Sequence, residues 1–267
     1  MSLYTLFLLA LIQGVTEFLP ISSSGHLILL PNLMGTEDQG QAIDVAVHVG
    51  TLGAVILYFW RDVRAAIAGT PRLLTGRIDT PGAKLAFLLV IATIPVILFG
   101  LFLEITGIYD SLRSIAVIGW TMLIFGLVLY WADQTGKHEK HSDGWSLRDA
   151  IVMGLWQAIA LIPGTSRSGI TITAARYLGY DRESAARVAM LMSIPTIIAS
   201  GVFAGAEVIA TADAQTARDG AIAAGLSFLA ALGALVLMFK LLKSVSFTPY
   251  VIYRVILGVV LLFIAYT

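Results

Sequence analysis

A polar stretch, QGVTEFLPISSSGH at residues 13–26, interrupts an apolar run near the start of the chain. A second stretch of the same kind, QAIALIPGTSRSG, occupies residues 157–169. Both contain proline and glycine and are flanked by sequence without charges, so we expect both at membrane depth, where ionisable side chains usually have a function. Broken hydrophobic segments at corresponding places in two halves of a membrane protein point to a site near the midplane.

The composition is that of an integral membrane protein. Of the 267 residues, 58% are hydrophobic and only 13% are charged, against about 25% charged in soluble domains. Mean hydropathy is +0.86. Cysteine is absent and the net charge is zero, so neither disulfides nor nucleic acid binding is expected. Six stretches have the length of a transmembrane helix, at about 42–60, 84–104, 113–132, 185–206, 218–240 and 248–266.

Two segments, 3–34 and 149–178, are too polar and too broken by proline and glycine to be simple spans. We expect each to be a re-entrant helix–loop–helix that enters and leaves on one side, with its break lining a cavity. The predicted fold is therefore all-α and polytopic, with six transmembrane helices and two re-entrant elements in one membrane domain, residues 1–267.

The two halves, about 1–132 and 148–267, match one another. Twelve residues separate Gln13 from Gly25 and also Gln157 from Gly169. Each half has one re-entrant element and three spans, and an odd number of spans inverts the second half. This is the inverted repeat of many transporters, and it lets the two breaks meet near the membrane centre.

Loop charge predicts the orientation. Lysine and arginine gather in the connections 61–83, 133–148 and 240–247, which the positive-inside rule makes cytoplasmic. The opposite loops are mostly acidic, with Glu37, Asp38, Asp44, Glu104, Asp110, Arg113, Glu207, Asp213, Arg218 and Asp219. A bacterial cytoplasmic (inner) membrane is the expected location, and the first break, entering from outside, makes the site open to the outer side.

In the first break, Gln13 and Glu17 share one helix face, and Pro20 ends that helix. Ser22, Ser23 and Ser24 follow, where they can cap the next helix. The start of a helix presents N–H groups and a positive dipole end, which suit an anion. His26 lies one turn further on.

In the second break, Arg167 lies among Thr165, Ser166 and Ser168 at another expected helix start. A guanidinium suits phosphate oxygens. Together the two breaks point to phosphoryl transfer. The arginine and N–H groups hold phosphate, a serine attacks, His26 shuttles a proton, and Glu17 orients the reactants or binds a divalent cation.

Structural roles for the same residues are the alternative. A serine in a membrane helix often bonds its own backbone, Arg167 can snorkel to the cytoplasmic face, and Gln13 can join two helices. His48 lies in an apolar span without polar neighbours in sequence, and we interpret it as structural.

At these residues the chain resembles the bacterial undecaprenyl-diphosphate phosphatase family of the bacitracin-resistance type. That family carries Glu/Gln-x-x-x-Glu, Pro-x-Ser-Ser-x-Gly-His and Pro-Gly-x-Ser-Arg-Ser-Gly. Here these motifs are Gln13 to Glu17, Pro20 to His26 and Pro163 to Gly169, in the same order and spacing. The similarity runs along the whole chain.

The resemblance implies hydrolysis of undecaprenyl diphosphate to its monophosphate and inorganic phosphate, which recycles the lipid carrier for cell-wall synthesis and confers bacitracin resistance. It implies that Glu17, Ser23, His26 and Arg167 are catalytic and that Mg²⁺ or Ca²⁺ is required. Gln13 stands where the family often has glutamate, which weakens the case for two carboxylate metal ligands. Which serine attacks, or whether water attacks directly, stays open.

A transporter or flippase for a phosphorylated lipid or an ion is the other function that broken helices in an inverted repeat favour. The combined Ser/His/Glu/Arg set exceeds what anion binding needs and favours the enzyme. A scaffold without a small-molecule site leaves Glu17 and Arg167 unexplained at depth. Expected partners are the polyprenyl diphosphate and membrane lipid, and a homodimer is compatible with the sequence.

Overall fold

Helices build the fold in the computed structural model, which describes residues 1–34, 39–211 and 213–267, without the side chains of residues 31–34, 110, 203 and 206–211. Within these ranges there is no strand, and one isolated bridge joins Lys140 to Tyr180. The helices are α1 (Leu3–Phe18), α2 (Ser23–Met34), α3 (Gln41–Tyr58), α4 (Trp60–Leu74), α5 (Pro81–Thr106), α6 (Ile108–Ser111), α7 (Ile115–Thr135), the 3-10 turn η1 (Ser142–Gly144), α8 (Leu147–Ile159), α9 (Arg167–Tyr177), α10 (Arg182–Thr211), α11 (Ala214–Leu241) and α12 (Thr248–Tyr266).

Six helices in the described ranges are long and apolar enough to cross a membrane: α3, α5, α7, α10 over Arg182–Val202, α11 and α12. They fall on the six stretches expected from the sequence, so the number and place of the spans are confirmed. The chain is an all-helical, multi-pass membrane protein.

Helix α4 was not expected from the sequence, and neither was the single turn α6. The connection 61–83, interpreted above as a loop, contains α4, which packs along α5. Glycines allow the close approach, because a Cβ on Gly69 would overlap the backbone of Ala83 and one on Gly82 would overlap the carbonyl of Ala65. Arg61, Arg64 and Arg72, which suggested a loop, lie on the exposed side of an amphipathic helix.

The basic connections gather at one end of the molecule. Asp62 in α4 accepts a hydrogen bond of 2.7 Å from Arg187 in α10. Asp133, at the end of α7, is 1% exposed and pairs with the buried Arg176 of α9 at 3.1 Å and with Arg182 of α10 at 2.8 Å. These ion pairs bring the ends of four elements to the same face, as the loop-charge pattern predicts.

The chain begins at the other end. The N-terminal ammonium group of Met1 lies 2.8 Å from Asp219 near the start of α11. Glu37 and Asp38, counted above among the acidic loops, lie outside the described residues, as do the side chains of Asp110 and Glu207. Helices α1 and α8 therefore start at opposite ends of the molecule, since α8 begins beside the basic face, where Asp149 meets Lys140 at 3.1 Å.

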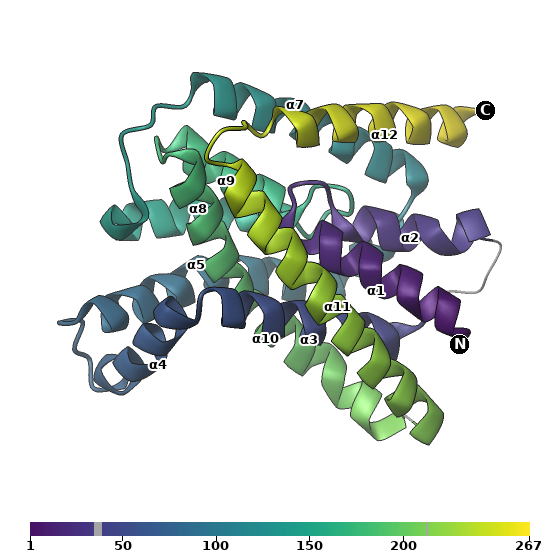
Figure 1. The fold of residues 1–267 in the computed structure, drawn as a ribbon, viewed down its shortest axis with the longest axis horizontal. Helices are drawn as coiled ribbons and strands as arrows, with labels where there is room; N and C mark the ends of the chain where they lie inside the picture. Colours follow the sequence, from purple (N-terminus) through teal and green to yellow (C-terminus); the bar gives the residue numbers. More distant parts are fainter. Residues whose placement is uncertain (35–38, 212) are drawn as a thin grey trace.

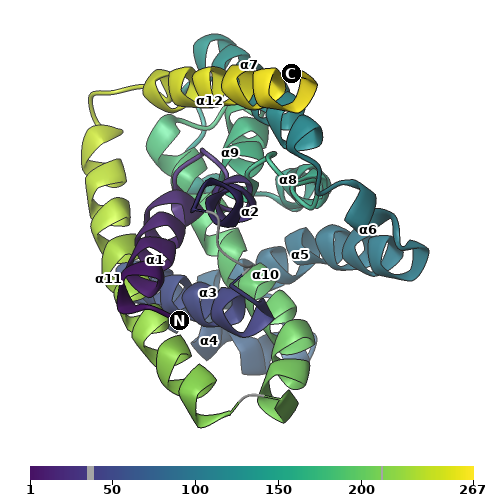
Figure 2. The same cartoon turned by 90° about the vertical axis from the view of Figure 1, so that its right-hand side faces the viewer.

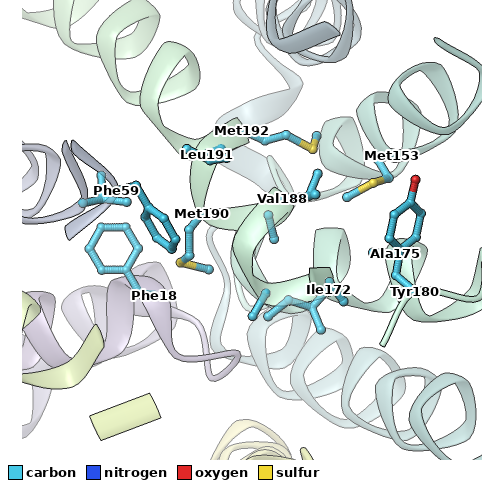
Figure 3. Packing of buried hydrophobic residues seen from close by; sticks show 14 of the residues in the cluster. Phe18, Phe59, Met153, Ile172, Ala175, Tyr180, Val188, Met190, Leu191 and Met192 are labelled. Atoms are coloured by element: carbon cyan, nitrogen blue, oxygen red, sulfur yellow. The ribbon is translucent and has the colours of Figure 1, made fainter. Parts of the chain in front are cut away.

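The largest apolar core joins α10 to the broken segments. Ala185, Ala186 and Ala189 of α10 are fully buried, and such small side chains let neighbouring helices approach closely. Figure 3 shows Phe18, Phe59 and Met190 together on one side of this core, and Met153 and Tyr180 on the other. Because Phe18 is the last residue of α1, the core fixes the place where the first break starts.

The four helices on either side of the two breaks lie among the longer helices (Figure 1). Figure 2 shows α1, α2, α8 and α9 between α11 on one side and α5 on the other, with α10 below them and the adjacent pair α7 and α12 above. The outer sides of α1 and α8 are exposed, with Phe7 47% and Ile151 43% exposed. The loops between α1 and α2 and between α8 and α9 are thus held inside the protein, where polar backbone is tolerated at membrane depth.

Candidate active site

The first break turns sharply at Ser22. Helix α1 ends at Phe18, before Pro20, and α2 starts at Ser23. Ser22 has φ 72°, a left-handed conformation that is uncommon for a residue other than glycine. Its side-chain oxygen accepts a hydrogen bond of 3.4 Å from Gly25 N–H, so Ser22 caps α2. Such unfavourable backbone conformations persist where the surrounding structure enforces them, often at functional sites.

The second break repeats this geometry. Ser166 has φ 71° and its hydroxyl accepts 3.1 Å from Gly169 N–H, capping α9. Ser22 and Ser166 are the two positive-φ residues other than glycine in the described part of the chain. The equivalence extends to further side chains, since Ser22 contacts Ser24 at 3.3 Å and Ser166 contacts Ser168 at 3.2 Å.

Glu17 joins the two breaks. Its carboxylate is 6% exposed and accepts three side-chain hydrogen bonds. Oε1 accepts 2.5 Å from Nη2 of Arg167, which is 150 residues away in the sequence. Oε2 accepts 2.8 Å from Gln13 Nε2 and 2.8 Å from the Ser23 hydroxyl. Arg167 therefore points to Glu17, and its side chain is only 15% exposed, so the alternative of a solvated, snorkelling arginine is wrong.

Three buried polar atoms beside this pair have no protein partner among the described residues: Nη1 of Arg167, the hydroxyl of Thr165 and Oε1 of Gln13. A buried donor or acceptor without a partner costs about 1–3 kcal/mol, so such groups usually have a ligand or water. Arg167 and Thr165 offer donors, and an anion with several oxygens satisfies both.

His26 makes two short hydrogen bonds, neither to the Ser23 hydroxyl. Its Nδ1 lies 2.6 Å from the carbonyl oxygen of Ser22, which can only accept, so Nδ1 carries a proton. Nε2 lies 2.5 Å from the hydroxyl of Tyr253, and the two rings stack with centroids 5.7 Å apart. In the neutral imidazole, Tyr253 therefore donates to the lone pair of Nε2.

Similarity to known proteins shows the family of this chain. The sequence matches the protein family described as "Bacitracin resistance protein BacA" over residues 6–260. The chain belongs to this family. It is 91% identical over 266 residues to the undecaprenyl-diphosphatase of Jannaschia sp. (strain CCS1), with both chains fully covered. It is 70% identical to that of Ruegeria pomeroyi over all of both chains, and 47% identical to that of Chromohalobacter salexigens over 95% of this chain and 96% of the relative.

The remaining hydroxyl groups of the bacitracin-resistance motifs lie around the same centre. Ser168 donates 2.9 Å to the carbonyl of Leu19 and so ties the second break to the first. Thr165, Ser166 and Ser168 are buried, Ser23 is partly exposed, and Ser24 is exposed. Ser23 is thus the one serine of its triplet that contacts Glu17 and is also open to a ligand.

Three residues near the site were missed in the sequence. His48 was interpreted as structural, but its Nε2 lies 3.7 Å from Glu17 Oε2, so that interpretation is wrong about its neighbours. Tyr253 and Arg254 come from α12, far from both motifs. An arginine inside an apolar span is itself a signal for function, and that signal at Arg254 was available in the sequence.

Two side-chain oxygen donors at this site could bind a divalent cation. Among the described residues, no group of three or more His, Asp or Glu side chains gathers in a metal-binding arrangement. Glu17 is one carboxylate, and the unpartnered Oε1 of Gln13 is a second oxygen close to it. Mg²⁺ is commonly held by one or two carboxylates together with substrate phosphates, so the residues fit a cation that arrives with a diphosphate.

Proposed function

We propose that this protein hydrolyses undecaprenyl diphosphate to undecaprenyl monophosphate and inorganic phosphate. In the bacterial cytoplasmic membrane this would recycle the lipid carrier of cell-wall synthesis and confer resistance to bacitracin. The contact of Ser23 with Glu17, whose other oxygen is paired with Arg167, carries the proposal. It combines a hydroxyl nucleophile, a base for its proton and a cation for phosphate in one buried place, as phosphoryl transfer requires.

The first step is attack of the Ser23 oxygen on the terminal phosphorus. The hydroxyl proton passes to Glu17 Oε2, which already accepts it in a hydrogen bond of 2.8 Å. The bond from the terminal phosphorus to the bridging oxygen breaks, and the electron pair leaves with undecaprenyl monophosphate. The Ser23 oxygen is left bonded to the phosphoryl group. Charge on the phosphoryl oxygens is stabilised by Arg167 Nη1 and Thr165, whose donors have no other partner among the described residues.

In the second step water attacks the phosphoryl group on Ser23. Glu17 returns the proton to the serine oxygen. One of the two protons of the water stays on the phosphate as a hydroxyl, and the other goes to the medium. Inorganic phosphate leaves and the resting hydroxyl is restored. Direct attack by water on the substrate is the alternative. It predicts that no phosphate is trapped on the protein when turnover is stopped with acid.

His26 stabilises the turn that presents Ser23. Its Nδ1–H donates to the carbonyl of Ser22, the residue with positive φ that precedes the nucleophile. Tyr253 fixes the ring from the other side through Nε2. A proton-shuttling role for His26 stays a prediction, supported by the direct link from its basic nitrogen to a phenol that can give or take a proton.

Mg²⁺ or Ca²⁺ would be held by Glu17 and Gln13 Oε1 together with oxygens of the diphosphate. When bound, it would neutralise phosphate charge. The neutral side chain at position 13 leaves one carboxylate here, which favours a cation that binds and leaves with the substrate.

For the topology, we propose one membrane domain made of two inverted repeats, about 1–132 and 148–267, each with a re-entrant element. The matched turns at Ser22 and Ser166, and the start of α1 and α8 at opposite ends, support this. The basic loops would be cytoplasmic and the site would open to the outer side. A homodimer stays a prediction for measurement of the oligomeric state in detergent.

The absence of cysteine allows a direct test of sidedness. Ser24→Cys introduces a thiol at an exposed position in the first break, and Asp143→Cys introduces one in the exposed basic loop. An impermeant maleimide added to intact cells should label the first and spare the second. The reverse pattern would place the opening on the cytoplasmic side.

The reaction itself is tested by phosphate release from undecaprenyl diphosphate or farnesyl diphosphate with detergent-purified protein. Wild type, Ser23→Ala and Arg167→Ala are compared with and without EDTA. Ser200→Ala is the control, because this exposed serine on α10 bonds only its own helix. Metal-dependent release by wild type and the control, lost in the other two variants, is expected. No release by folded wild type would refute the enzyme and favour a carrier.

A further inference from the structure

Arg254 is a buried arginine whose hydrogen bonds to the described residues all end on backbone carbonyl oxygens. It belongs to α12, and its side chain is 0% exposed. Nη2 donates 2.9 Å to Thr165 and 3.2 Å to Gly164 in the second break, and Nη1 donates 3.4 Å to Pro20 in the first. The remaining bonds reach α7, at 3.3 Å to Met122 and 3.4 Å to Thr121. One guanidinium thus contacts both breaks and the helix beside them.

Two glycines on other helices make room for this side chain. A Cβ on Gly169 of α9 would lie 2.8 Å from Nη1 of Arg254. A Cβ on Gly126 of α7 would lie 3.2 Å from the Cβ of Arg254, and 3.7 and 3.8 Å from its Nε and Cδ. Helices α7, α9 and α12 are therefore shaped around one arginine.

Arg254 differs from the other fully buried arginine because no carboxylate among the described residues pairs with its charge. Arg176 pairs with Asp133 at 3.1 Å, whereas the ion pairs formed by the described residues include none for Arg254. A cation held by carbonyl dipoles alone is expensive inside a membrane protein. Hydrophobic residues of similar size would fill the space at lower cost. The presence of an arginine at this position beside the site therefore indicates that its charge and the N–H donors of its guanidinium have a function.

We propose that Arg254 is the positioning residue of the active site. It joins Pro20 to Gly164 and Thr165, and so sets how far Arg167 and Thr165 lie from Glu17 and Ser23. Its positive charge also adds to the field that attracts a diphosphate. This inference rests on the proposed phosphatase function and adds to it a residue outside all three sequence motifs.

The test compares kcat and KM of Arg254→Met and Arg254→Lys with those of wild type, alongside thermal unfolding. A displacement of about 1 Å between reacting groups costs about 100-fold in rate. We therefore expect Arg254→Met to lose about 100-fold in kcat, with a smaller rise in KM because the charge that helps to attract the diphosphate is removed. Lysine keeps the charge but has no fork to reach both breaks, so Arg254→Lys should recover part of that loss.

Arg176→Met is the matched control, since it removes an equally buried arginine at the basic end. It should lower thermal stability while the folded protein keeps the wild-type kcat. A wild-type kcat in either Arg254 variant would overturn the inference. It would also be overturned if kcat fell in proportion to the loss of stability in the Arg254 and the Arg176 variants alike. If Arg254→Met does not fold, Arg254→Lys decides: a kcat lowered at least about tenfold supports the proposal, and an unchanged kcat overturns it. Lack of turnover by wild type in the same assay would instead refute the proposed function.

Discussion

Substitutions of Glu17 and Arg167 should have non-additive effects on stability, and each should also lower the rate of catalysis. Both side chains are largely buried, and the closest approach is 2.5 Å. Removing one member of a buried pair leaves an uncompensated charge and costs about 3–5 kcal/mol. Glu17→Gln and Arg167→Gln are the perturbations, because they keep most of the volume and remove one charge each.

Each single substitution should therefore lower the unfolding free energy by about 3–5 kcal/mol, which corresponds to a fall in melting temperature on the order of 10 °C. The double variant has no buried charge left at this position. Its loss should be smaller than the sum of the two single losses by about 2 kcal/mol or more. Arg167→Gln should also lose about 100- to 1000-fold in kcat, as removal of one donor to a reacting oxygen does. Glu17→Gln should lose about 100- to 10,000-fold, as removal of a general base does.

Thermal unfolding of the detergent-purified protein, followed by circular dichroism, measures the stability, and phosphate release measures the rate. Asp133→Asn is the control, since Asp133 is equally buried and holds two arginines away from the site. It should lose comparable stability but keep its turnover per folded molecule. Additive effects of the two single substitutions would refute the reasoning, because they would mean that the pair contributes no coupling.

Three further predictions address neighbouring contacts. Tyr253→Phe removes the hydroxyl from His26 but keeps the stacked ring, so kcat should fall about tenfold or more without loss of fold by circular dichroism. Gly14→Ala should destabilise by about 1–3 kcal/mol, because a Cβ would lie 2.6–2.9 Å from atoms of α11. Gly233→Ala, which meets nothing within 4 Å, should be neutral or slightly stabilising in the same melting experiment. Gln13→Glu adds a second carboxylate and should lower the Mg²⁺ concentration for half-maximal activity by about tenfold in a metal titration.

The sequence was sufficient for the spans and for the position of the two breaks, because both depend on local hydropathy, proline and glycine. Helix α4 was missed because its arginines were interpreted as loop charges, although they follow the spacing of an amphipathic helix. In this segment the spacing of the arginines, and not their number, indicates the helix.

The contacts within the site depend on residues far apart in the chain. Nothing local to Glu17 indicates that its cation is Arg167, and nothing near His26 indicates Tyr253. His48 looked isolated for the same reason, since its polar neighbour Glu17 belongs to another helix. Such contacts are set by helix packing, which single-sequence patterns do not encode.

The 150 residues between the two members of the ion pair also set a time during biosynthesis. At about 5–20 residues per second, a ribosome needs roughly 8–30 s to make the chain between them. For most of that interval Glu17 has left the ribosome while Arg167 is not yet made. The nascent first half must keep this carboxylate in contact with water or in its protonated form until α9 is inserted. A chain truncated before α8 would retain that acid without its arginine partner.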